Sequence, residues 1–378
     1  MKIACYTDIH IQQTMLNLPV TIRQSATKAA ELTAEIWGKA DLGIVGGDNI
    51  SDYPEWNRSC ALPYRNWLDM KQQLTATFAA AAKGGRVLYV DGNNDMILGD
   101  FPTAENPPYN TCDFYPAPMG DTLGMLTPAD YIAKYAAAKG KQAGEHLLAF
   151  HYTVDGIDFF GLNIDPDTAF NSHDGVYAPE ALAWLKQKIN EADPEGNKLI
   201  FVVGHLSATV TMKGTDLRED MDEERRTALY DVFKGHRNLF YLYGHVHGQD
   251  HVHADSATGI LHFDKEGRLL ANPCKEDNRA VADKRDFSTV HMGGLRPFLV
   301  WNGSLPHGEY FQNDVVPGTV PGEEEGTSHA GTATPRLAQF LLIETGETSV
   351  TFRYRNTGDY PGYTTEDIPA PYTVTLLP

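Results

Sequence analysis

Five short polar clusters hold the side chains of this sequence that could do chemistry. Among their residues are two Asp, one Asn and four His that could bind metal ions, because oxygen and imidazole groups are metal ligands in proteins. The total suits a pair of ions that share one carboxylate, an arrangement that can hold the attacking and departing oxygens of a displacement at phosphorus. The clusters are Asp8-Ile9-His10, Gly47-Asp48-Asn49, Gly92-Asn93-Asn94-Asp95, Gly204-His205 and Gly244-His245-Val246-His247.

Each cluster stands at the end of an apolar run of strand length. Because side chains repeat every two residues along a strand, Asp8 and His10 share one face, and so do His245 and His247. Ligands of α/β sheets bind beyond the carboxyl ends of the strands. Gly244-His245-Val246-His247 is the strongest single signal, whereas each of the other clusters alone would be read as a surface turn or a core His, so the prediction depends on all five together. The runs are Lys2 to Tyr6, Leu42 to Val45, Val87 to Val90, Leu199 to Val203 and Leu239 to Tyr243.

Helical segments lie between several of these strands, and two pairs of strands read as hairpins. The alternation of strand and helix favours an α/β layered fold. The hairpins span His151 to Leu162, around Asp155-Gly156, and Leu337 to Tyr354. We therefore expect two sheets packed face to face with helices outside. The expected helices are Thr21 to Trp37, Tyr64 to Ala82, Pro179 to Ile189 and Glu223 to Phe233.

In their order and spacing, the clusters resemble the calcineurin-like metallophosphoesterases, whose pattern is D-x-H, G-D, G-N-H-[DE], H and G-H-x-H. The match runs from Asp8 to His247, and the late hairpin resembles the close of that fold. The resemblance implies a four-layer αββα sandwich with two mixed β-sheets and a dinuclear metal site at the strand carboxyl ends.

The resemblance also implies how the ligands are shared. One ion would take Asp8, His10, Asp48 and His247, and the other would take Asp48, Asn93, His205 and His245. Oxygen and imidazole ligands without thiolate suit Mn, Fe or Zn and do not choose among them.

One position departs from the family pattern. Asn94 stands where the family commonly has a His that binds the phosphoryl group and helps to protonate the leaving oxygen, with Asp95 as its orienting partner. Asn can donate a hydrogen bond to phosphate but cannot deliver a proton at pH 7. Loss of a positioned general acid typically lowers the rate ~10²–10⁴-fold. His151 and His173 are alternatives for the missing acid.

The resemblance implies a metallophosphoesterase that hydrolyses a phosphomonoester or phosphodiester through a metal-bridging hydroxide. Two alternatives remain open. One is a catalytically weakened metal-binding or interaction protein on the same fold, which Asn94 would favour. The other is a protein phosphatase, for which the acidic composition offers no obvious docking site.

Composition limits the partners. The 378-residue chain carries a formal net charge of −19, which disfavours nucleic acid and anionic membrane surfaces. A small phosphate ester could still be attracted by bound metal. The four Cys form no C-x-x-C pair, and no apolar run reaches the ~18–20 residues of a membrane span. The chain enters its first apolar run at once, so we expect no signal peptide and a cytoplasmic location.

The domain organisation is expected to be simple. Residues 1–355 would form one metallophosphoesterase domain with insertions near 100–127 and 250–335, and residues 356–378 would be a C-terminal extension. Both insertions are rich in Gly and Pro, and the first carries aromatic residues that suit a lid.

Overall fold

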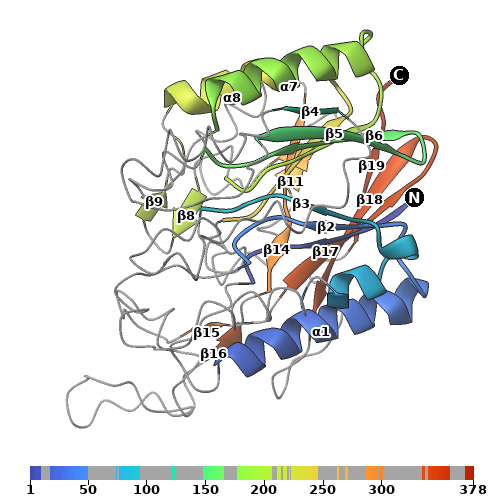
Figure 1. The fold of residues 1–378 in the computed structure, drawn as a ribbon, viewed down its shortest axis with the longest axis vertical. Helices are drawn as coiled ribbons and strands as arrows, with labels where there is room; N and C mark the ends of the chain where they lie inside the picture. The colour runs from blue at the N-terminus through green and yellow to red at the C-terminus, as the bar shows by residue number, and fades with distance from the viewer. Residues whose placement is uncertain are drawn as a thin grey trace, which may run out of the picture.

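Two mixed β-sheets packed face to face, with helices on both outer faces, make up the fold (Figure 1). The four-layer α/β architecture predicted from the sequence is thereby confirmed. The computed structural model describes residues 1–9, 18–49, 74, 76–93, 121–123, 148–165, 177–206, 211–213, 216–218, 221, 223–245, 262–263, 269–270, 287–295, 298–300, 334–336, 339–357 and 371–378.

The first sheet joins the two ends of the chain. Its strands run in the order β19-β18-β17-β1-β2-β3, with β14 also paired to β17. The strands β1, β2 and β3 are parallel, and β17 is antiparallel to β1. The bounds are β1 Lys2–Tyr6, β2 Leu42–Val45, β3 Val87–Tyr89, β14 Gly293–Gly294, β17 Gln339–Thr345, β18 Ser349–Asn356 and β19 Tyr372–Thr375.

The second sheet has the order β13-β10-β7-β6-β5-β4. Its strands β6, β7, β10 and β13 are parallel, and the β5–β6 and β4–β5 pairs are antiparallel. The bounds are β4 Asp121–Leu123, β5 Ala149–Val154, β6 Ile157–Leu162, β7 Ile200–Val203, β10 Leu239–Tyr243 and β13 Ser288–His291.

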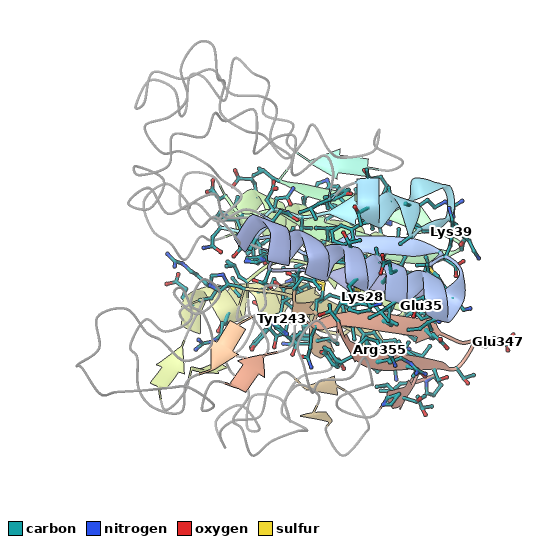
Figure 2. The ribbon with its side chains drawn as sticks, turned by 90° about the horizontal axis from the view of Figure 1, so that it is seen from below. Lys28, Glu35, Lys39, Tyr243, Glu347 and Arg355 are labelled. Carbon is teal, nitrogen blue, oxygen red and sulfur yellow. The ribbon has the colours of Figure 1, made fainter. Side chains whose placement is uncertain are left out.

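Helices cover the outer faces of both sheets. Figure 1 shows α7 and α8 above the second sheet and α1 below the first. Figure 2, which views the molecule from below, shows α1, with its residues Lys28 and Glu35 labelled, lying across the first sheet. The labelled Glu347 marks the turn between β17 and β18. The remaining elements are α1 Leu18–Trp37, α7 Pro179–Ala192, α8 Glu223–Phe233, the 3-10 helix Lys83–Gly85, and the two-stranded pairs β8 Thr211–Lys213 with β9 Asp216–Arg218, β11 His262–Phe263 with β12 Leu269–Leu270, and β15 Phe298–Val300 with β16 Thr334–Arg336.

The central strands are buried on both faces, which explains their continuous apolar runs. In β1, Ile3 and Cys5 point into the core between the sheets, whereas Ala4 and Tyr6 pack beneath α1. A third apolar cluster fills the space between the second sheet and the helices α7 and α8. The strands are therefore held from both sides, and their carboxyl ends form a rigid base for the polar clusters.

The predicted elements that fall on described residues agree closely with the observed ones, whereas most of the predicted helix Tyr64 to Ala82 lies outside the described residues. The strands predicted at Lys2 to Tyr6, Leu42 to Val45 and Leu239 to Tyr243 have the observed bounds, as does the helix Glu223 to Phe233. The first hairpin turns at Asp155 (φ 50°) and Gly156 (φ 84°), the two positive φ values that a two-residue type I′ turn requires.

Part of the expected C-terminal extension belongs to the first sheet. Within residues 356–378, β19 pairs antiparallel with β18 and becomes an edge strand. The domain boundary at residue 355 stays a prediction, and most of the two expected insertions lies outside the described residues. No helix in the described parts of the chain has the length and apolarity needed to cross a membrane.

Candidate metal centre

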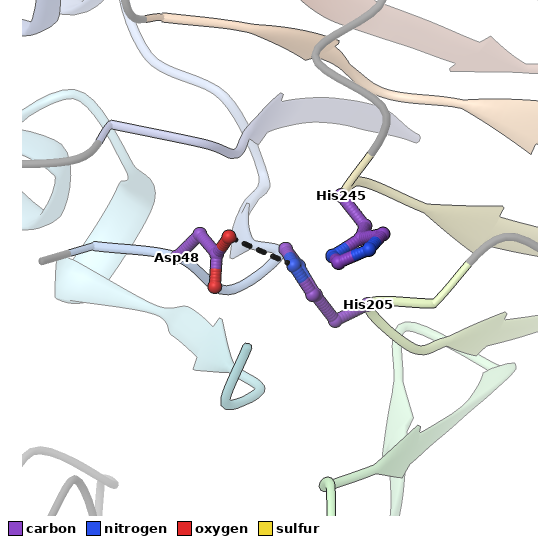
Figure 3. A group of neighbouring side chains, drawn as sticks. All are labelled: Asp48, His205 and His245. Atoms are coloured by element: carbon purple, nitrogen blue, oxygen red, sulfur yellow. Dashed lines mark ion pairs between the residues drawn. The ribbon is translucent and has the colours of Figure 1, made fainter. Parts of the chain in front are cut away.

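Three buried side chains that could hold a metal ion meet at the carboxyl ends of the strands. Asp48 follows β2, and His205 and His245 follow β7 and β10, so the two sheets both contribute. One donor atom from each lies within 4.8 Å of the others. His205 Nε2 is 3.2 Å from Asp48 Oδ2, the ion pair drawn in Figure 3. The His205 and His245 rings meet edge to face, with centroids 5.2 Å apart.

Asn93, which follows β3, joins this group. Its Oδ1 atom lies 2.8 Å from His245 Nδ1. The structure therefore brings together all four residues that the sequence predicts for the second ion: Asp48, Asn93, His205 and His245.

Asp8 connects the end of β1 to the end of β10. Its carboxylate accepts the backbone N–H of His245 at 3.0 Å and 3.1 Å, one distance to each oxygen. The Thr7 hydroxyl donates to Asp8 Oδ2 at 2.9 Å. Asp8 is fully buried. Its carboxylate is therefore both a predicted ligand and a hydrogen-bonded link between the two sheets.

Two further hydrogen bonds cross between the sheets beside the cluster. His205 Nδ1 lies 2.8 Å from the carbonyl oxygen of Gly46, in the first sheet. Asn163, at the end of β6 in the second sheet, accepts the backbone N–H of Asp91 with its Oδ1 atom at 2.9 Å. These links fix the distance between the loops that carry the ligands.

The backbone at the site is unusual. Asp8 (φ 52°), Asp48 (φ 52°) and His245 (φ 67°) are three of the four described non-glycine residues with positive φ. Such backbone is disfavoured for residues with a Cβ, and it gathers at functional sites. The left-handed turns redirect each side chain from the strand direction toward the space between the loops.

Glycines make the close approach possible. A Cβ at Gly92 would lie 2.1 Å from Asp48 Oδ1, and a Cβ at Gly244 would lie 2.7 Å from Asp8 Oδ2. A Cβ at Gly47, whose φ is 93°, would lie 2.6 Å from His205 Nδ1. The glycines that accompany the ligands in the sequence are thus required by the absence of space for any side chain.

The protonation of His205 depends on its carboxylate neighbours. Burial by itself lowers the pKa of the imidazole, but the negative charge of Asp48, 3.2 Å from Nε2, together with Asp8 and the Gly46 carbonyl, raises the pKa to about 10. A carbonyl can only accept, so His205 Nδ1 carries hydrogen and Nε2 is the atom directed at Asp48. A metal ion at Nε2 would replace the proton there.

The donor set fits a metal ion. His205 Nε2 is buried and makes no hydrogen bond of acceptable geometry to the described residues, although Asp48 is nearby. Asn93 Oδ1 lies 2.8 Å from His245 Nδ1, and Asp48 Oδ2 lies 3.2 Å from His205 Nε2, so these oxygen and imidazole groups are close enough together to hold a metal ion. The buried polar side chains of the described residues include Asp and His but no Lys or Arg. Cations would therefore supply positive charge that the buried polar side chains of the described residues provide only through histidine.

Four predicted site residues lie outside the described residues: His10, Asn94, Asp95 and His247. Of the first predicted ligand set, Asp8 and Asp48 are described. His173 also lies outside, but His151 does not: its Nε2 is 2.9 Å from Asp158 Oδ1, and its ring stacks on Phe160 on the helix-covered face of the second sheet. Asp158 is opposite Ile200 at the start of β7, away from the strand ends that carry the ligands. This placement does not support His151 as the missing acid.

Sequence reasoning missed several residues that shape the site. Thr7 bonds Asp8 and the Gly46 carbonyl, and Asn163 holds the start of the turn that carries Asn93. Tyr177 accepts the backbone N–H of His205. Thr7 could have been suspected from its place beside Asp8, but nothing in the sequence marks the other two.

Comparison with known proteins identifies the family of the chain. Residues 1–249 match the family model of the calcineurin-like phosphoesterases. No curated protein gives a significant match to the sequence. Among solved structures, a dimetal phosphatase from Danio rerio is similar over 100% of this chain and 99% of its own, with a TM-score of 0.50 and 12% identity. A protein provisionally assigned as a 5′-nucleotidase from Staphylococcus aureus is similar over 100% of this chain and 55% of its own, with a TM-score of 0.40 and 11% identity.

Proposed function

Since the chain belongs to the calcineurin-like phosphoesterase family, we propose that it hydrolyses a small phosphomonoester or phosphodiester with the help of two metal ions. The observation that supports this most strongly is the meeting of Asp48, Asn93, His205 and His245 from four separate strands. The acidic composition favours a small substrate over nucleic acid. The cytoplasmic location stays a prediction.

The proposed ligand sets are those expected from the sequence, with Asp48 shared between the two ions. When bound, Mn, Fe or Zn ions would activate a water molecule for attack and compensate negative charge on the phosphoryl group. His205 offers Nε2 because its Nδ1–H is directed at the Gly46 carbonyl. The Asp8 carboxylate is oriented by the N–H of His245 and the hydroxyl of Thr7. The site is thus organised before substrate arrives, which is the arrangement that favours charge stabilisation in a transition state.

Asp48→Ala tests the shared ligand. Because this carboxylate would serve both ions, the variant should lose bound metal and hydrolysis of p-nitrophenyl phosphate together, by at least ~10²-fold in rate. The measurements are metal content after dialysis and the rate with added Mn²⁺ or Zn²⁺. Asp193→Ala, which removes a buried carboxylate at the end of α7, is the matched control and should keep its metal. A metal-loaded, active Asp48→Ala protein would refute the proposal.

Asn94→His tests the proposed role of Asn94. In the proposal, Asn94 donates a hydrogen bond to a phosphoryl oxygen and delivers no proton. An added imidazole should raise the rate for substrates with alkoxide leaving groups more than for p-nitrophenyl esters, by up to ~10²-fold. Parallel assays of a monoester and a diester with the same leaving group would also reveal the substrate preference. An equal change for good and poor leaving groups would contradict this role.

A further inference from the structure

The predicted ligand His205 is held by a tyrosine hydroxyl that neither the family pattern nor the ligand geometry includes. The Tyr177 hydroxyl accepts the backbone N–H of His205 at 2.9 Å and that of Leu206 at 2.9 Å. Tyr177 stands just before α7, and its side chain reaches beneath that helix to the end of β7. One side chain therefore receives two consecutive N–H groups of the loop that carries the ligand.

A second tyrosine completes this arrangement. The Tyr241 hydroxyl, from β10, lies 2.7 Å from that of Tyr177 and donates to the carbonyl oxygen of Leu206 at 2.8 Å. Since the one hydrogen of Tyr241 goes to Leu206, the hydrogen between the two hydroxyls must come from Tyr177. This assignment is consistent with the other contacts of Tyr177, because its hydroxyl oxygen already accepts two N–H groups and can only donate to Tyr241.

The two tyrosine hydroxyls are buried and closely packed against the loop that carries His205. Tyr241 is fully buried and Tyr177 is 5% exposed. A Cβ at Gly204 would lie 2.4 Å from both hydroxyl oxygens, so the residue before the ligand must be glycine for the tyrosines to reach the loop. The backbone of residues 204–206 is thereby fixed by packing and by hydrogen bonds.

We propose that Tyr177 is a positioning residue for the metal ligand His205 and that Tyr241 sets the direction of its hydroxyl. The inference rests on the proposed function, because it assigns His205 to metal. Besides the ion pair with Asp48, two hydrogen bonds position His205: the Gly46 carbonyl accepts from Nδ1–H, and the Tyr177 hydroxyl accepts from the backbone N–H. Without the hydroxyl, two buried N–H groups lose their acceptor at once. Because buried N–H groups need partners, the loop turns to find others, and the imidazole moves with it.

Tyr177→Phe tests this directly, because it keeps the ring in the core and removes only the oxygen. Loss of groups that orient metal ligands typically weakens binding about 10–100-fold, and we expect a Kd for Zn²⁺ or Mn²⁺ about tenfold higher. The visible absorption of the Co²⁺-loaded protein should also shift, which a general loss of stability would not produce. Tyr6→Phe is the matched control: its buried hydroxyl bonds Thr33 at 3.0 Å beneath α1, and its removal should leave both readings unchanged.

Tyr241→Phe supplies a graded second test. It leaves both N–H groups with the Tyr177 oxygen but frees the direction of that hydroxyl, so the rise in Kd should be smaller and the Co²⁺ shift still visible. If Tyr177→Phe fails to fold, this variant decides alone. Wild-type metal affinity and Co²⁺ absorption in the variants that fold would overturn the positioning role and leave the proposed function intact. Failure of the wild-type protein to bind any of these metals would overturn both.

Discussion

At the scale of single residues, the site stores conformational strain. Asp8, Asp48 and His245 adopt positive φ values that L-residues disfavour by roughly 1–2 kcal/mol each. The surrounding contacts maintain these conformations: Asp8 is bonded to His245, and Gly92 closes on Asp48 without room for a Cβ. These three conformations lower the free energy of unfolding, but they turn three candidate metal ligands toward the same space.

Substitutions at Asp48 should separate strain from chemistry. Asp48→Gly and Asp48→Ala both remove the carboxylate, but only alanine retains the penalty for φ 52°. We expect Asp48→Gly to be more stable than Asp48→Ala by about 1–2 kcal/mol, with metal binding lost in both. Urea unfolding of the two metal-free variants measures the difference. Equal stabilities would show that the backbone relaxes when the carboxylate is removed.

At the scale of elements, β13 ends beside the site in a histidine that stays neutral. Burial, assisted by the charge of His205, lowers the pKa of His291 to about 3. Its Nδ1 atom accepts the N–H of Gly293 at 3.0 Å, and the Tyr354 hydroxyl donates to its carbonyl oxygen. The connection from β13 to β14, which passes between the two sheets, thus depends on an uncharged imidazole.

His291→Asn tests this dependence through pH. Between pH 3 and the ordinary pKa of 6.5, the imidazole at position 291 is protonated in the unfolded chain but neutral in the native state. Stability therefore falls as the pH falls below 6.5, by up to about 1.4 kcal/mol per pH unit. Asparagine keeps an acceptor for Gly293 but does not titrate.

The free energy of unfolding of His291→Asn should accordingly fall less steeply than that of the wild type between pH 6.5 and 5. Both proteins should be measured by urea unfolding with a chelator present, because metal binding is itself pH-dependent. Parallel pH profiles would show that His291 protonates without loss of stability.

The strands and helices were largely predictable because strong local patterns determine them. The run before Asp8 and the turn at Asp155-Gly156 carry their structural signals within a few residues, and the observed bounds agree. The convergence of Asp48, His205 and His245 was also predictable, because parallel strands end at one edge. Tyr177 and Asn163 were not, since their roles depend on contacts between sheet and loop that leave no periodic trace.

At the scale of the whole molecule, the predicted metal site connects the two sheets. Asp48 and Asn93 follow strands of the first sheet, and His205 and His245 follow strands of the second. A bound ion would therefore hold the halves of the sandwich together. Far from the site, Asn238 ties the second sheet to the C-terminus, donating to Leu377 O and accepting its N–H, both at 2.8 Å.

Removal of metal should consequently lower global stability. A ligand that binds only the folded protein at 100 times its Kd stabilises it by about 2.7 kcal/mol. Thermal unfolding with and without chelator should show this as a lower Tm for the metal-free wild type, whereas Asp48→Ala should show no metal-dependent change. With a net charge of −19, non-specific cation binding must be controlled by sodium chloride at equal ionic strength. An unchanged wild-type Tm would argue against a site that spans the sheets.

The place of β1 has a consequence for how the protein is made. This strand lies between β2 and β17, yet β17 begins only at Gln339, long after the last predicted ligand has been synthesised. A nascent chain ending near residue 249 would contain all the predicted metal ligands. Its first sheet would still lack β17, so the edge of β1 that pairs with β17 would be exposed. Such edges invite pairing with other chains. We therefore expect folding of the nascent protein to depend on protection by the ribosome or a chaperone until β17 has been synthesised.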